Sequence, residues 1–148
     1  MTRQEIAANY QTLLTTIVQQ KGAIDAIVYL WALEDRSLLK DYSILASMLQ
    51  GIAAGKIAVK HILLAAQWPT QKNDPNLERC YAESWIGFER SLKLILPGVQ
   101  LRAVYEEIVQ QPTGITEWTN RIWAELNSAE KDRCCIHKGS GIYSKCNL

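Results

Sequence analysis

The chain has 148 residues, of which 48% are hydrophobic and 21% are charged, a composition typical of a single globular domain with its own core. Its net charge of +1 provides no broad basic surface, so nucleic acid is not expected as a partner. The first residues form no apolar leader, and no stretch reaches the roughly 18 uncharged apolar residues of a membrane span. We therefore expect a cytoplasmic protein with no membrane partner.

The first predicted elements are a helix and a strand. Thr2 and Glu5 have the spacing of a capping box, and apolar residues then recur at helical spacing up to Gly22, which predicts a helix over residues 3–21. A nearly continuous apolar run at residues 24–31 predicts a strand that is covered on both faces. We expect the charged residues 32–40 to form a loop.

A second helix and strand follow. Asp41 or Ser43 can cap a helix in which Gly51 permits close packing and Gly55 ends the last turn. Residues 59–67 predict a second buried strand, and the polar residues 68–76 predict an irregular loop.

The third unit is a helical pattern over residues 78–96, which Pro97 and Gly98 terminate. Residues 99–105 predict the third strand. Thr113 can cap a helix that runs to residue 126, and residues 133–137 and 142–146 flank a glycine-containing turn that predicts a hairpin.

This alternation of helices and strands predicts a small parallel sheet with right-handed crossovers and helices on both faces. The fold class is therefore α/β: a truncated Rossmann-like fold with three main strands and a short C-terminal hairpin. Residues 1–148 are interpreted as a single domain, with residues 131–148 as its linker and hairpin.

Polar or aromatic side chains near the predicted carboxyl ends of the strands are the candidates for chemistry, because ligands bind at that edge in such sheets. These candidates are Trp31, Glu34, Asp35, Gln67, Trp68, Glu106 and Glu107. Acidic residues in such positions are usually only solvated. Glu106 and Glu107 lack any partner in the sequence pattern that would push their pKa values apart, so no acid–base pair is assigned.

Cofactor and metal motifs are missing. Gly139-Ser140-Gly141 lacks the third glycine and the following helix of a dinucleotide site, and no phosphate-binding loop occurs. His61 is interpreted as a surface or hydrogen-bonded histidine. The chain has no CxxC pair, and neighbouring strand residues point to opposite faces, so zinc is not expected at His137. We expect free thiols at Cys80, Cys134, Cys135 and Cys146.

Four segments carry a family resemblance: residues 24–35, 41–43, 61–67 and, above all, LERCYAESWIGFERSL at residues 77–92, which Leu96 and Pro97 follow. In this order they resemble the non-catalytic, structural half of ketoreductase domains in modular polyketide synthases. The likeness is strongest to the type whose acyltransferases act in trans, and it covers roughly residues 10–130.

The resemblance implies two Rossmann-like halves that lie side by side, of which this chain represents the half without cofactor. The other half would bind NADPH and reduce β-ketoacyl groups on an acyl carrier protein. The resemblance further implies that the helices at residues 41–54 and 78–96 contact that catalytic half, in a polyketide synthase module or in another chain. Because Trp85 and Phe88 would be exposed on an uncovered helix face, the chain alone is expected to self-associate or to be poorly stable.

The chain departs from the catalytic pattern of the family, in which a Tyr is followed four residues later by Lys or Asn, with a Ser upstream. Here Tyr81 is followed by Ser84 and Trp85, and an indole cannot relay a proton as Lys or Asn would. No YxxxK occurs anywhere. The family's first strand and helix would precede Thr2, and its catalytic half would follow Leu148.

The chain alone is therefore not expected to be an enzyme, and we assign no catalytic, cofactor-binding or metal-binding residue. Two alternatives stay open. One is a stand-alone interaction module or a non-functional remnant of a polyketide synthase gene. The other is a minimal nucleotide-dependent reductase, which the missing glycine-rich turn disfavours.

Overall fold

The computed structural model describes residues 2–69, 80, 81, 84, 85, 87, 88, 91, 92, 94–108, 114–128, 134–138 and 142–145. Its elements are α1 (Arg3–Lys21), β1 (Ile24–Tyr29), α2 (Trp31–Glu34), the 3-10 helix η1 (Arg36–Leu39), α3 (Ser43–Ala54), β2 (Val59–Pro69), β3 (Gln100–Ile108), α5 (Ile115–Leu126), β4 (Cys134–Lys138) and β5 (Ile142–Lys145). Between β2 and β3, the described residues from 80 to 95 are helical, and we call them the 80–95 helix.

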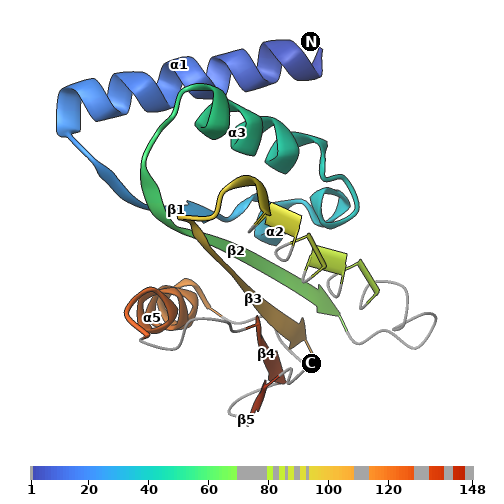
Figure 1. Ribbon diagram of the computed structural model, residues 1–148. Coiled ribbons are helices and arrows are strands. Elements are labelled where there is room, and N and C mark those ends of the chain that lie inside the picture. Colours follow the sequence, from blue (N-terminus) through green and yellow to red (C-terminus); the bar gives the residue numbers. More distant parts are fainter. Residues whose placement is uncertain are drawn as a thin grey trace.

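The strands form one sheet in the order β1-β2-β3-β4-β5, which is also their order along the chain (Figure 1). β1 to β4 are parallel to their neighbours, and β5 pairs antiparallel with β4. The predicted α/β class, the parallel sheet and the C-terminal hairpin are confirmed. The three main strands are β1, β2 and β3, as predicted, and the hairpin strands extend the same sheet through the pairing of β4 with β3.

Helices cover both faces, as the apolar strands predicted. Alternate residues of β2 point to opposite sides. Ile62, Leu64 and Ala66 join a core with α1, α3 and the 80–95 helix, whereas Leu63 and Ala65 pack with α5. Figure 1 shows α1 and α3 on one side of the sheet and α5 on the other.

The third crossover differs in hand from the first two. The steps from β1 to β2 and from β2 to β3 pass through helices on the α3 face, whereas the step from β3 to β4 passes through α5 on the opposite face. Because all three steps move in the same direction along a parallel sheet, a change of face reverses the hand. The expectation that every crossover is right-handed is therefore wrong.

The ends of α1 agree with the capping prediction. Thr2 N–H donates to Glu5 Oε2 at 2.6 Å, and Glu5 N–H donates to Thr2 Oγ1 at 3.3 Å. At the other end Gly22 has φ +89°, a conformation that favours glycine, and its N–H donates to Val18 O at 2.9 Å. No described helix is long and apolar enough to cross a membrane.

The connection after β1 is helical, so the predicted loop at residues 32–40 is wrong. β1 ends at Tyr29, and α2 begins at Trp31 after a single intervening residue. Asp35 then accepts a hydrogen bond from Ser37 N–H at 2.9 Å, which satisfies the first turn of η1. The N-cap of α3 is Tyr42, so the prediction of Asp41 or Ser43 as the cap is wrong, although Asp41 Oδ1, one residue before the cap, accepts from Ser43 N–H at 2.8 Å.

β2 and β3 are each longer than predicted. Their parallel pairing runs from His61 opposite Gln100 to Pro69 opposite Ile108, so the ladder continues beyond the predicted strand ends at residues 67 and 105. α5 begins at Ile115 with Gly114 as its N-cap, and Thr113 lies outside the described residues.

The contact between α1 and α3 depends on Gly51. A Cβ at this position would lie 2.8 Å from Ala7 O and 2.9 Å from Gln11 N, which are backbone atoms of α1. We expect Gly51→Ala to destabilise the chain by about 1–3 kcal/mol, because the two helices would have to separate.

Gly87→Ala is the matched control, because a Cβ there meets nothing within 4 Å and the residue is also helical. Alanine in a helix is favoured over glycine by up to about 1 kcal/mol, so this variant should be neutral or more stable. Urea unfolding of both variants measures the difference, and an equal response would exclude close α1–α3 packing.

Candidate functional site

An aromatic cluster occupies the carboxyl edge of the sheet on the α3 face. Trp85 of the 80–95 helix is 1% exposed and stands at its centre. The ring centroids of Tyr29, Tyr42 and Tyr105 lie 6.0, 6.0 and 6.3 Å from that of Trp85. The expected exposure of Trp85 is therefore wrong: the indole is a core side chain, and its apolar helix face covers the sheet.

The hydroxyl groups beside this cluster are bonded to one another and to the helix backbone. Tyr42 Oη donates to Tyr81 O at 3.2 Å and also lies in hydrogen-bond contact with Ser84 Oγ. Ser84 Oγ in turn lies 2.6 Å from Tyr81 O, to which it donates. Lys40 Nζ lies 5.4 Å from the ring centroid of Tyr81, a cation–π contact on the ring face. These contacts join the start of α3 to the 80–95 helix.

Two phenols of the cluster, Tyr29 and Tyr42, have pKa values that burial raises, so both stay protonated at neutral pH. Burial raises the pKa of Tyr29 to about 12, with smaller contributions from Tyr10 and nearby carboxylates. Burial also raises the pKa of Tyr42, against the smaller opposing effect of its hydrogen bond to Ser84. A phenol that relays a proton in a reductase needs a lowered pKa, and the pKa values of Tyr29 and Tyr42 are shifted in the opposite direction.

The candidates after the first strand do not converge. Trp31 is 47% exposed, and Glu34 and Asp35 are exposed in α2 and at the cap of η1. Only Leu30 separates β1 from α2, so this turn has no glycine-rich backbone to approach a pyrophosphate.

The candidates after the second and third strands lie inside the ladder. Gln67 pairs with Glu106, and Trp68 pairs with Glu107, along β2 and β3. Gln67 Nε2 donates to Leu33 O at 3.2 Å, which ties β2 to α2. The side chains of Trp68 and Glu107 lie outside the described part of the structure.

Glu106 has a charged partner that the sequence reading did not identify. It points to the α5 face, is 2% exposed, and accepts a hydrogen bond from Arg121 Nη1 at 3.0 Å. The other terminal nitrogen of Arg121 is bonded to Glu117, one helical turn away. The i, i+4 spacing of Glu117 and Arg121 was the available sequence signal.

Arg102 fastens the end of α5 to β3. Its guanidinium is 4% exposed and donates to Glu125 O and, at 2.9 Å, to Ser128 O. Glu125 O belongs to the last turn of α5 and Ser128 O lies just beyond its end, where intrahelical donors run out and a cation is favourable. The buried charges of the α5 face therefore hold the fold and line no described cavity.

His61 and the cysteines form no metal site in the part of the chain that is described. His61 is half-buried in β2, opposite Ala26. Cys80 is a free, exposed thiol, as expected. The side chains of Cys134, Cys135 and His137, and all of Cys146, lie outside the described residues. Among the residues that are described, no three His, Cys, Asp or Glu side chains gather to bind a metal ion.

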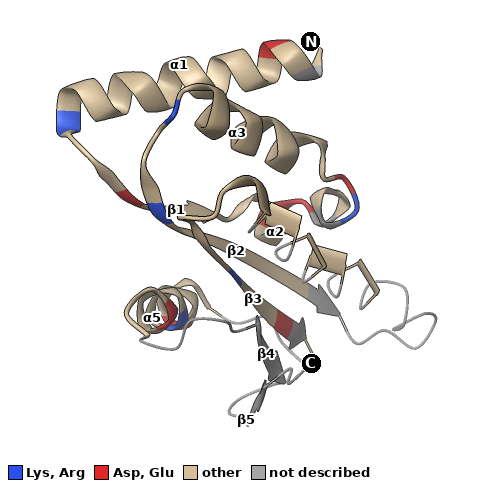
Figure 2. Ribbon diagram, viewed as in Figure 1, with Lys and Arg blue, Asp and Glu red and all other residues tan. Residues whose placement is uncertain are grey.

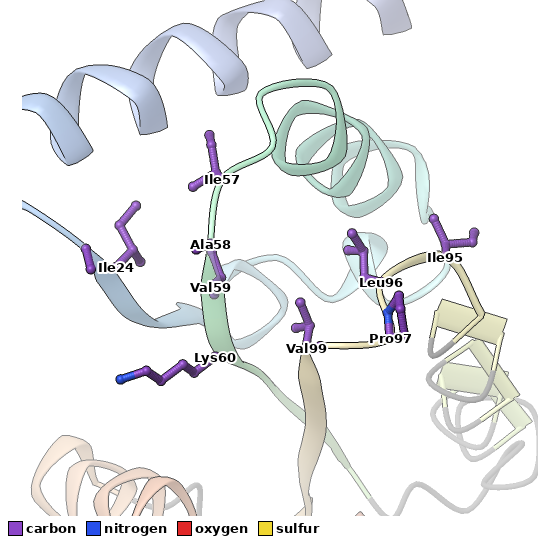
Figure 3. Close-up of a pocket in the computed structure, with 11 residues that line it drawn as sticks. Ile24, Ile57, Ala58, Val59, Lys60, Ile95, Leu96, Pro97 and Val99 are labelled. Carbon is purple, nitrogen blue, oxygen red and sulfur yellow. The ribbon is translucent and has the colours of Figure 1, made fainter.

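A hollow of about 420 Å³ opens at the opposite, amino-terminal edge of the sheet (Figure 3). It is lined by apolar residues that include Ile24, Val59, Leu96 and Val99, and Lys60 directs its ammonium to Asp25 at 2.6 Å. Ligands of parallel α/β sheets bind at the carboxyl edge, so this hollow is not placed as an active site.

Comparison with known proteins identifies a polyketide synthase relative. The chain is 36% identical over 127 residues, or 86% of its length, to polyketide synthase PksM of Bacillus subtilis (strain 168). The chain spans only 3% of the length of that protein. No protein-family model matches the chain, and no solved structure matches it. The chain is thus related to one short segment of a polyketide synthase.

Proposed function

We propose that the chain is the non-catalytic structural half of a polyketide synthase ketoreductase. It scaffolds a separate catalytic half, which binds NADPH and reduces β-ketoacyl groups on an acyl carrier protein. The observation that carries this proposal is Trp85. It stands four residues after Tyr81, where a reductase would need Lys or Asn, and it is sealed among three tyrosines. The relationship to a polyketide synthase segment supports the same function.

The outward faces of two helices supply the surface for the catalytic half. On the 80–95 helix, four described positions that face away from the sheet carry small side chains at helical spacing, Cys80, Ser84, Gly87 and Ser91, and the exposed Leu94 and Ile95 follow at its end. On α3 the corresponding positions, exposed or half-buried, carry Ala46, Gln50, Ala53 and Ala54. We call these two rows the small-residue face. Figure 2 shows that α3 has no charged residue along its length.

This face suits the close approach of two further helices. Small side chains let helix axes pack near the lower end of the usual 8–10 Å separation. A surface of this kind, without charges on α3, also loses little solvation when it is covered. The buried aromatic cluster beneath it anchors the 80–95 helix to the sheet, which favours a preorganised surface for a partner.

Co-expression tests the proposal. We expect the chain to co-purify in a one-to-one complex with a ketoreductase catalytic half from the polyketide synthase genes of the source organism. The complex, and neither part alone, should oxidise NADPH in the presence of a β-ketoacyl thioester. Ser91→Arg should abolish the complex, because it places a long cation on the small-residue face. Asn120→Arg, at an exposed position of α5 on the other side of the sheet, should leave the complex intact.

NADPH titration of the chain alone tests whether the chain is itself a reductase. Five tryptophans make a bound nicotinamide visible as fluorescence quenching, and we expect no saturable signal. Saturable NADPH binding would overturn the assignment in favour of a reductase. Failure to associate with any catalytic half would instead favour the stand-alone module or the non-functional remnant.

A further inference from the structure

The open edge of β1 is the least protected surface of the described sheet. β1 has β2 on one side, and in the described part of the chain no strand pairs with its other side. Edge strands usually carry lysines, prolines or bulges that prevent further pairing. β1 reads IDAIVY and has none of these, and its single charge, Asp25, is bonded to Lys60 of β2 at 2.6 Å.

An apolar groove runs beside this edge, beneath α1. It has a volume of about 230 Å³ and is lined by residues of α1, by residues 27–31 and by Met48 of α3. Leu13 of α1 lines the groove and is 55% exposed, and Ile17, one turn further along, is 36% exposed. Leu30 and Trp31, at the far end of the edge, are 40% and 47% exposed. Exposed apolar side chains grouped in this way mark an interaction surface.

We propose that a second copy of this chain covers the edge, with β1 of the two copies paired antiparallel about a two-fold axis perpendicular to the sheet. A dimer of this kind is isologous, so one patch must complement itself. In a register centred on Ile27, Asp25 faces Tyr29 of the copy, which avoids placing two aspartates opposite each other. The pairing turns two small sheets into one continuous sheet.

The same axis brings the two α1 helices together on one face. They run antiparallel, which also aligns their dipoles favourably. If the helices cross near Leu13, the exposed leucines meet, and Glu5 of each copy lies beside Lys21 of the other. Figure 2 shows these opposite charges at the two ends of α1. A single arrangement thus pairs the open edge of β1, covers the apolar groove and places opposite charges of the two α1 helices side by side.

This surface is distinct from the small-residue face proposed for the catalytic half. The sequence predicted self-association through an exposed Trp85, but that side chain is buried, so α1 and β1 replace it as the surface for a second copy. Each copy could bind its own catalytic half while the dimer persists.

Light scattering of the full chain over a range of concentrations tests the proposal. We expect a dimer, and we expect Leu13→Lys to raise the dimer dissociation constant at least tenfold while the far-ultraviolet circular dichroism is unchanged. Ile115→Lys is the matched control, because Ile115 is 77% exposed on α5, and it should not affect the dimer. Ser91→Arg should also leave the dimer intact, which separates this test from that of the catalytic-half contact.

Disulfide trapping tests the geometry directly. In a chain whose four native cysteines are replaced by serine, Leu13→Cys should cross-link the two copies under mild oxidation, and Ala53→Cys on α3 should not. A monomer at all concentrations would overturn the proposal. So would a dimer that resists Leu13→Lys and fails to cross-link through position 13.

Discussion

Replacing Trp85 with alanine should lower the free energy of unfolding by about 3–5 kcal/mol, because a large buried side chain leaves a cavity that its neighbours fill only in part. The indole is 1% exposed and makes edge contacts with Tyr29 and Tyr105 at ring separations of 6.0 and 6.3 Å. Aromatic pairs of this kind contribute about 0.5–1.5 kcal/mol each beyond their burial. Single domains have only about 5–15 kcal/mol of stability, so the variant should be close to unfolding.

Trp123→Ala is the matched control for this prediction. Trp123 lies on α5 and is 69% exposed, so its removal should change stability by no more than about 0.5 kcal/mol. Guanidinium unfolding, followed by far-ultraviolet circular dichroism, compares the two variants. Equal effects would show that Trp85 is not the centre of the core on this face and would weaken its role as an inert replacement for a catalytic residue.

Replacing Arg121 with methionine should destabilise the chain by about 3–5 kcal/mol, because the change removes the guanidinium from a carboxylate in a dry environment. Glu106 is 2% exposed and lies 3.0 Å from Arg121 Nη1. The double variant Arg121→Met/Glu106→Leu removes both charges, and much of the loss should then be recovered. Chemical unfolding of the single and double variants measures the coupling.

The exposed ion pair between Lys60 and Asp25 is the control for the Arg121 variant, because it tests whether burial determines the strength of an ion pair. Its atoms are closer, at 2.6 Å, but both side chains are more than 70% exposed. Lys60→Met should therefore leave the free energy of unfolding almost unchanged, because solvent screens an exposed pair. A loss at Lys60 as large as that at Arg121 would show that distance, rather than burial, decides the strength of these pairs.

The sequence predicted the elements whose signals are local. The capping box at Thr2 and the positive φ of Gly22 place both ends of α1, because each cap satisfies backbone groups within one turn. The apolar stripe that contains Trp85 and Leu92 likewise predicted the 80–95 helix. The stripe turned toward the sheet, since burying it there removes more apolar surface from water than leaving it for a partner.

The features that the sequence did not predict depend on distant pairings. Glu106 was assigned to a solvated strand end, because nothing near it in sequence shows that the ladder with β2 continues to Ile108. The contact between Tyr42 and Ser84 joins residues 42 positions apart. The sequence alone shows that neither Lys nor Asn stands four residues after Tyr81. The burial of Trp85 at that position, in contrast, could be seen only in the folded structure.

The strand order has a consequence for how the chain folds. Each strand pairs with the strand that precedes it in the sequence, from β1 to β5, so no strand must wait for a later one to provide its first neighbour. Because each strand pairs with its predecessor, the loops that close on folding are short for a parallel sheet. Short loops cost less entropy to close, which favours faster folding. During synthesis, the sheet can grow one strand at a time as the chain emerges from the ribosome, from β1 to β5, which form the two edges of the described sheet.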